Sequence, residues 1–163
     1  MTDIRIVEVV NLQVMTMDWL LQSDGTLDET QELATAVSVA LGSDALADQD
    51  EVLPDPDSTD RRGWWADYQA DVIWNGWPIG CKNWLLRRAK IISDQASLEG
   101  TTVQRAHDYT EAALQPFVDQ RICSGVQVTA WRAADQRIYV DVIMYRGPKQ
   151  DIALRFQVLW SES

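Results

Sequence analysis

The chain has 163 residues, of which 46% are hydrophobic and 24% charged, so it can bury a core as a single domain over residues 1–163. Its formal net charge of −11 at pH 7 argues against a nucleic-acid partner and against an anionic membrane, because both are themselves negatively charged. No signal-peptide core and no apolar run of roughly 18–20 residues occurs. We therefore expect a soluble protein made in a cytoplasm.

The N-terminal part is rich in β-branched and apolar residues. Two such stretches, 4–10 and 12–21, predict strands within residues 1–23. A broad apolar stripe over residues 28–41 then predicts a helix, and Gly42 suits the position just after its end.

Residues 44–60 form an acidic segment with seven acids, two prolines and no basic residue. This is long for a connection without secondary structure in a compact domain. The acids lack the spacing and the glycine of a calcium-binding loop. We expect a solvated acidic loop without a metal.

Five of the eight tryptophans fall in residues 60–86, where Arg61 and Arg62 precede the adjacent Trp64 and Trp65. Tryptophan and arginine dominate the energetics of many protein–protein contacts. Two adjacent residues of a regular segment cannot both face the same interior. We expect one of these tryptophans to pack inside, and the other to reach a partner or to stack on Arg61 or Arg62.

The remaining segments predict helices followed by a sheet. Apolar residues over 81–92 predict a helix with Trp84 in the core, and a second helix begins with a capping box at Thr101 and Gln104 and runs to Val118. Within residues 121–161, apolar residues alternate in three stretches, 126–130, 138–144 and 152–160. The pattern predicts an α+β fold. In it, a C-terminal three-stranded antiparallel meander with one buried face packs against two or three helices and is joined by the N-terminal strands.

Catalytic and metal-binding patterns are weak. His107 is the only histidine and lies mid-helix without a motif that would orient it, and the two cysteines, Cys81 and Cys123, are expected to be free buried thiols. Glycoside hydrolysis needs two carboxylates in an enclosed site, but the acids here concentrate in the loop. We predict no catalytic, cofactor-binding or metal-binding residue, and a protein that is not an enzyme.

The segment Asp119-Gln120-Arg121 joins the long helix to the first strand of the meander. Two readings of Arg121 stay open: it neutralises the C-terminus of the helix, or it contacts a partner.

Several segments occur together in a fixed order. They are Asp60-Arg61-Arg62-Gly63-Trp64-Trp65-Ala66-Asp67, Ile79-Gly80-Cys81-Lys82-Asn83-Trp84-Leu85-Leu86-Arg87-Arg88-Ala89-Lys90, Ala112-Ala113-Leu114-Gln115-Pro116-Phe117-Val118-Asp119, and Ala153-Leu154-Arg155-Phe156 with Leu159-Trp160. Over residues 24–161, this order resembles the Mu-like phage baseplate family called gene product 46. The Arg-Gly-Trp-Trp element is its most specific part.

That family is similar to the wider gene product 25-type group of baseplate wedge and sheath-initiator proteins of contractile tails. In that group, a Glu-Pro-Arg motif at the end of the long helix contacts larger wedge subunits. The matching positions here keep the arginine but replace glutamate by aspartate and proline by glutamine. The predicted partner-binding residues are Asp119, Arg121, Asp60, Arg61, Arg62, Trp64 and Trp65.

The resemblance implies a virion protein of the tail baseplate, assembled in the host cytoplasm. It would join larger wedge subunits to the tail sheath protein and seed the sheath by β-strand addition at a free sheet edge. Tail tube and spike-hub proteins are further candidate partners. Two alternatives stay open: a peptidoglycan-cleaving, lysozyme-like enzyme, and an acidic cytoplasmic adaptor unrelated to phage.

Overall fold

The structure is a computed structural model. It describes residues 6–11, 14–19, 32–64, 67, 69, 72, 76, 78–87, 102–133, 137–147 and 149–158. By its internal contacts the chain divides into two compact units, Met1–Val39 and Ala40–Ser163. The expectation of one domain over residues 1–163 stays a prediction.

In the first unit, strands β1 (Ile6–Asn11) and β2 (Val14–Trp19) pair antiparallel, with Ile6 opposite Trp19. The two predicted N-terminal strands are thus present, and the rest of segment 1–23 lies outside the described residues. Helix α1 (Glu32–Gly42) contains the boundary between the units. It buries Leu33, Val37 and Ala40 at helical spacing, as the apolar stripe predicts, while residues 28–31 are not described.

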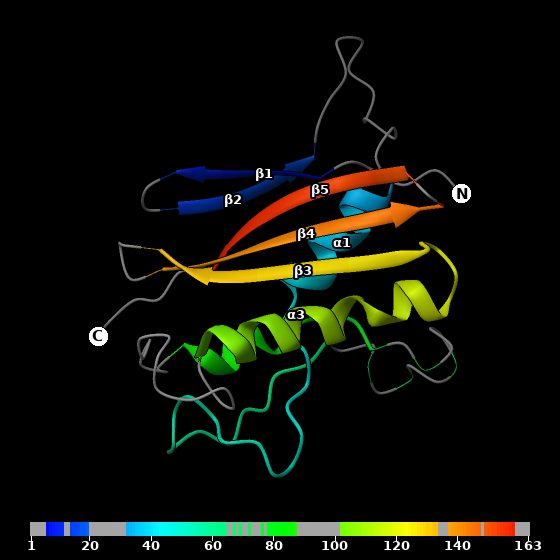
Figure 1. Ribbon diagram of the computed structural model, residues 1–163. Coiled ribbons are helices and arrows are strands. Elements are labelled where there is room, and N and C mark those ends of the chain that lie inside the picture. Colours follow the sequence, from blue (N-terminus) through cyan, green and yellow to red (C-terminus); the bar gives the residue numbers. More distant parts are fainter. Residues whose placement is uncertain are drawn as a thin grey trace. The chain divides into compact units, whose positions relative to one another are not determined.

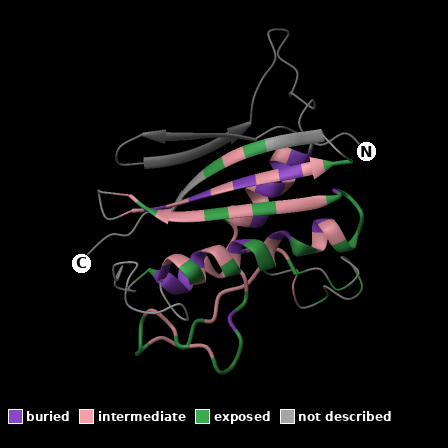
Figure 2. Cartoon of the chain, viewed as in Figure 1, coloured by how far each residue is buried: buried purple, intermediate pink, exposed green. Residues whose placement is uncertain are grey.

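The second unit contains an antiparallel sheet in the order β3-β4-β5, formed by β3 (Gly125–Arg132), β4 (Ile138–Arg146) and β5 (Lys149–Val158) (Figure 1). The central strand alternates between buried and half-exposed side chains, so one face is buried (Figure 2). The buried side chains on this strand are Ile138, Val140, Val142 and Met144. The predicted meander and the α+β class are confirmed, while Trp160 lies outside the described residues.

Helix α3 (Thr102–Asp119) runs along this sheet and packs on β3 and β4 (Figure 1). Its buried residues recur every three or four positions: Thr102, Ala106, Thr110, Leu114 and Phe117. This confirms the predicted second helix; Thr101 of the predicted capping box is not described.

The predicted helix over residues 81–92 is wrong in type where it is described. Lys82–Leu86 form a short 3-10 helix, η2, that packs against α3, and residues 88–92 lie outside the described part. Trp84, Leu85 and Leu86 are all buried. Successive side chains of a 3-10 helix point about 120° apart, so η2 is covered on more than one side. The core position predicted for Trp84 is confirmed.

The sheet has two edges, β3 and β5. The amide of Ala133 donates to the carbonyl of Arg137 where the β3–β4 hairpin closes. Since bonding alternates along an antiparallel pair, Thr129 bonds to β4, whereas the amides of Val128 and Ala130 point away from it. The outer rim of β3 thus presents backbone donors.

Candidate interaction site

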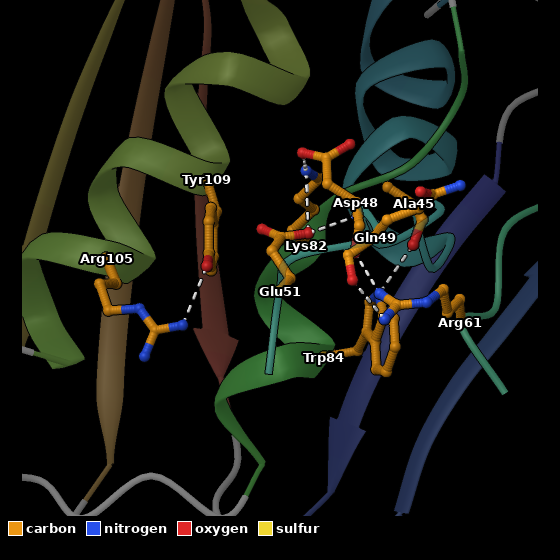
Figure 3. A network of polar contacts seen from close by, with 9 residues as sticks. All are labelled: Ala45, Asp48, Gln49, Glu51, Arg61, Lys82, Trp84, Arg105 and Tyr109. Carbon is orange, nitrogen blue, oxygen red and sulfur yellow. Dashed lines mark hydrogen bonds and ion pairs between the residues drawn. The ribbon is translucent and has the colours of Figure 1, made fainter. Parts of the chain in front are cut away.

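The acidic segment is fastened to η2 at its start. Ser43 accepts from the amide of Cys81 at 2.9 Å, and the amide of Ala45 donates to the carbonyl of Cys81 at 3.2 Å. The indole Nε1 of buried Trp84 donates to the carbonyl of Ala45 at 2.8 Å (Figure 3). A segment without secondary structure therefore begins in a fixed position.

Arg61 points back into the acidic segment. Its guanidinium donates to the carbonyls of Asp48 and, at 2.7 Å, of Gln49, and its own carbonyl accepts from the amide of Ala47 at 3.0 Å (Figure 3). The planar fork of arginine suits two adjacent carbonyls. These bonds hold the loop, which gives this predicted partner-binding residue a structural role within the chain.

Arg62 forms an ion pair with Asp44, and its guanidinium carbon lies 4.8 Å from the centroid of the Trp84 ring. Its amide donates to Asp60 at 2.8 Å. The aromatic partner of Arg62 was not anticipated from the sequence, because Trp84 lies 22 positions further along the chain.

Lys82 closes the other side of the loop. Its Nζ lies 2.5 Å from Asp48 Oδ2 and 3.0 Å from Glu51 Oε2 (Figure 3). Burial disfavours the charged ammonium, but the hydrogen bonds and the attraction of Asp48 and Glu51 outweigh it and raise the pKa of Lys82. The expectation of a merely solvated loop is thus wrong for Asp44, Asp48 and Glu51, which pair with cations from outside the segment.

Asp60, Arg62 and Trp64 come together around a hollow of about 520 Å³, here called the Trp64 hollow. Ser43, Asp44 and Gly63 complete its lining. The amide of Trp64 donates to Asp67 Oδ2 at 2.8 Å, which fixes the backbone at the first of the two adjacent tryptophans. Trp65 lies outside the described residues.

Asp119 and Arg121 lie at the end of α3 and do not line this hollow. The amide of Arg121 donates to the carbonyl of Val118, and that of Ile122 to the carbonyl of Phe117, both at 2.9 Å. These two bonds form a Schellman motif, in which Arg121 occupies the left-handed position that glycine usually fills. Its φ is 60°, and it is exposed. Asp119 accepts from the side chain of Gln115 at 2.8 Å.

Arg62 and Arg121 share an unusual backbone. Among the described residues, they are the two non-glycine residues with positive φ, 54° and 60°. This conformation costs an L-residue about 1 kcal/mol or more, and such strain concentrates at functional sites. Both arginines also belong to the set that the sequence predicts to contact partners.

Other candidate groups carry less chemistry. His107, Asp108 and Glu111 place potential ligand atoms within 4.8 Å of one another on α3, but exposed groups of this kind are common without an ion. Cys81 and Cys123 are free and buried, as predicted. Arg105 donates to the hydroxyl of Tyr109 at 3.0 Å on the other side of the network (Figure 3).

At Gly80 the backbone passes close to the backbone of Asp44 and Ala45, where the acidic segment is fastened. The φ of Gly80 is 127°, and a Cβ there would lie 2.6 Å from the amide nitrogen of Ala45. We expect Gly80→Ala to lower the free energy of unfolding by about 3 kcal/mol, because neither backbone can withdraw. Gly147→Ala is the matched control. Gly147 also has positive φ, 69°, but meets nothing within 4 Å, so about 1 kcal/mol is expected. If urea denaturation shows that Gly80→Ala and Gly147→Ala lose the same unfolding free energy, the close approach at Gly80 is contradicted.

Burial raises the pKa of Cys81 to about 11 from an ordinary 9.0. The thiol therefore ionises in the unfolded chain at a lower pH than in the folded chain, so stability falls as the pH rises from 9 to 11. By pH 10, wild type should lose about 1 kcal/mol more than Cys81→Ala relative to pH 8. Cys123 is present in both proteins and cancels. If wild type and Cys81→Ala lose the same unfolding free energy between pH 8 and pH 10 in denaturation experiments, this prediction is wrong.

Among the described residues, no helix combines the length and apolarity that crossing a membrane requires.

Comparison with known proteins agrees with the motif order. The family model of phage protein GP46 matches residues 33–151. The baseplate protein gp46 of Escherichia phage Mu is 34% identical over 112 residues, which cover 69% of this chain and 68% of the Mu protein. No solved structure matches. The region matched by the family model includes the acidic segment, Arg62, Arg121 and most of the sheet. The chain therefore belongs to the GP46 family of phage proteins.

Proposed function

We propose that the protein is a structural, non-enzymatic component of a phage tail baseplate. The observation that carries this proposal is the 34% identity to the Mu baseplate protein over two thirds of both chains. Membership of a phage family argues against an adaptor unrelated to phage. Among the described residues, no observation favours the peptidoglycan-cleaving alternative. The protein would assemble in the host cytoplasm and reside in the tail of the virion.

Within the baseplate, we propose the role of a wedge that joins larger wedge subunits of a contractile tail to the sheath and seeds sheath assembly. The rim of β3 supports this, since its outward amides can pair with an extended arm of a sheath subunit. Main-chain bonds would supply the binding strength, and the alternating side chains would set the register.

Arg121 is the proposed contact to the larger wedge subunits. It is exposed, and its left-handed backbone conformation fixes the direction in which the side chain leaves the chain just before β3. An arginine kept where glycine would fit more easily supports a role beyond ending the helix.

Arg121→Gly separates these two roles. Glycine suits positive φ, so the free energy of unfolding should stay level or rise by up to about 1 kcal/mol. Incorporation into purified tails should nevertheless fall at least as far as with Arg121→Ala, because both variants lose the guanidinium. Gln120→Ala, one residue away, is the control and should assemble. Normal tails with Arg121→Gly would remove Arg121 from the interface.

Ala130→Pro tests strand addition. Proline removes an amide that points away from β4, so the isolated protein should stay folded. Co-assembly with the sheath protein should fail, because the added strand loses a bond and meets the proline ring. Ala130→Val adds similar volume, keeps the amide and should still seed sheaths, as seen by electron microscopy. If both variants seed equally, β3 is not the augmented edge.

A further inference from the structure

A second hollow, of about 480 Å³, lies between the acidic segment and α3. We call it the Asp67 hollow. One wall is a single face of α3, where Ala112 and Ala113 lie three and four positions after Tyr109 and four and three positions before Pro116. The short side chains of the two alanines leave the space open. The other walls come mainly from Leu46, Gly76, Pro78 and Gly80, so the interior is largely apolar.

One polar atom beside this hollow has no partner. Asp67 lines it, and its Oδ2 accepts the amide of Trp64, but its Oδ1 is fully buried and accepts no hydrogen bond. Buried carboxylate oxygens almost always have a donor, because leaving one unpaired costs the full desolvation of the group. The atom therefore calls for a donor that the described chain does not supply.

Charge restricts the kind of donor. Asp48 and Lys82 also line the hollow, but Lys82 is shared between Asp48 and Glu51 (Figure 3). The hollow is thus lined by two carboxylates, those of Asp48 and Asp67, and by one ammonium, which Glu51 also shares. A cationic donor balances this excess, and an apolar stem suits the alanine and proline wall. Arginine meets both conditions, since its guanidinium is weakly hydrated and its stem is apolar.

We propose that the Asp67 hollow receives an arginine side chain of a neighbouring protein, whose stem lies along Ala112, Ala113 and Pro116. A shift of the Asp67 side chain on binding brings the buried Oδ1 to the surface of the hollow, where the guanidinium donates to it. That the neighbour is another baseplate chain rests on the proposed function. The preference of the hollow for a guanidinium does not.

The test is a titration of the full-length, ¹⁵N-labelled protein with N-acetyl-arginine amide, followed by NMR. Its neutral isostere, N-acetyl-citrulline amide, is the control ligand. We expect saturable amide shifts at Gly80, Ala112 and Ala113 with the arginine probe at millimolar concentration, and at least a tenfold weaker response to citrulline.

Three variants sharpen the result. Asp67→Asn keeps an acceptor for the amide of Trp64 but removes the charge, and should weaken binding about tenfold. Ala112→Leu fills the hollow and should abolish binding. Asp57→Asn removes one charge from the exposed part of the acidic segment and should bind like wild type.

Equal shifts with both probes, or equal weakening by Asp57→Asn and Asp67→Asn, would overturn the proposal and leave Asp67 Oδ1 to an internal water. If Asp67→Asn fails to fold, the comparison of probes and Ala112→Leu still decides. The titration uses the isolated protein, so its failure would leave the baseplate role intact, and failure of tail incorporation would leave the titration result intact.

Discussion

The shape of the acidic segment depends on cations that lie outside it. Arg61 donates to two backbone carbonyls, Arg62 pairs with Asp44, and Lys82 joins Asp48 to Glu51. The Arg62–Asp44 and Lys82–Glu51 pairs are half-buried, where salt screens attraction less than at an open surface, whereas Asp48 is exposed. Without the three cations, seven acids would repel one another and the segment would extend into solvent. Both hollows would then lose a wall.

The same chemistry explains why Trp84 matters more than its burial suggests. The guanidinium of Arg62 lies over its ring, and its Nε1 donates to the carbonyl of Ala45. One side chain thus connects the core to both ends of the loop. Leu53 and Tyr109 pack against the cluster of Ala47, Trp84 and Leu85. The loop is therefore an extension of the core rather than an appendage.

Regular elements were predictable because their signals are local. Alternation over the β4 segment and helical spacing in α3 arise within a few residues, and the fold class followed from them. The anchors of the loop were not predictable, since Lys82 lies 34 positions from Asp48 and Arg62 lies 18 from Asp44. The 3-10 geometry of η2 was missed because its apolar residues also fit an α-helix. In the sequence, Asp67 is only one residue of a motif. Its candidate binding role follows from its buried, unpaired Oδ1, which the sequence does not reveal.

Beyond Leu53, the loop is built differently. The amides of Asp57 and Ser58 bond to Asp55 within the same turn, and Pro56, Asp57 and Thr59 are exposed. Extra residues placed there would lengthen a surface turn without moving Leu53 or Arg61, and the entropic cost of a longer closed loop grows only slowly. Relatives of this chain can thus differ in length at this point while keeping the same scaffold, and a fluorescent or affinity label can be spliced in at the same place.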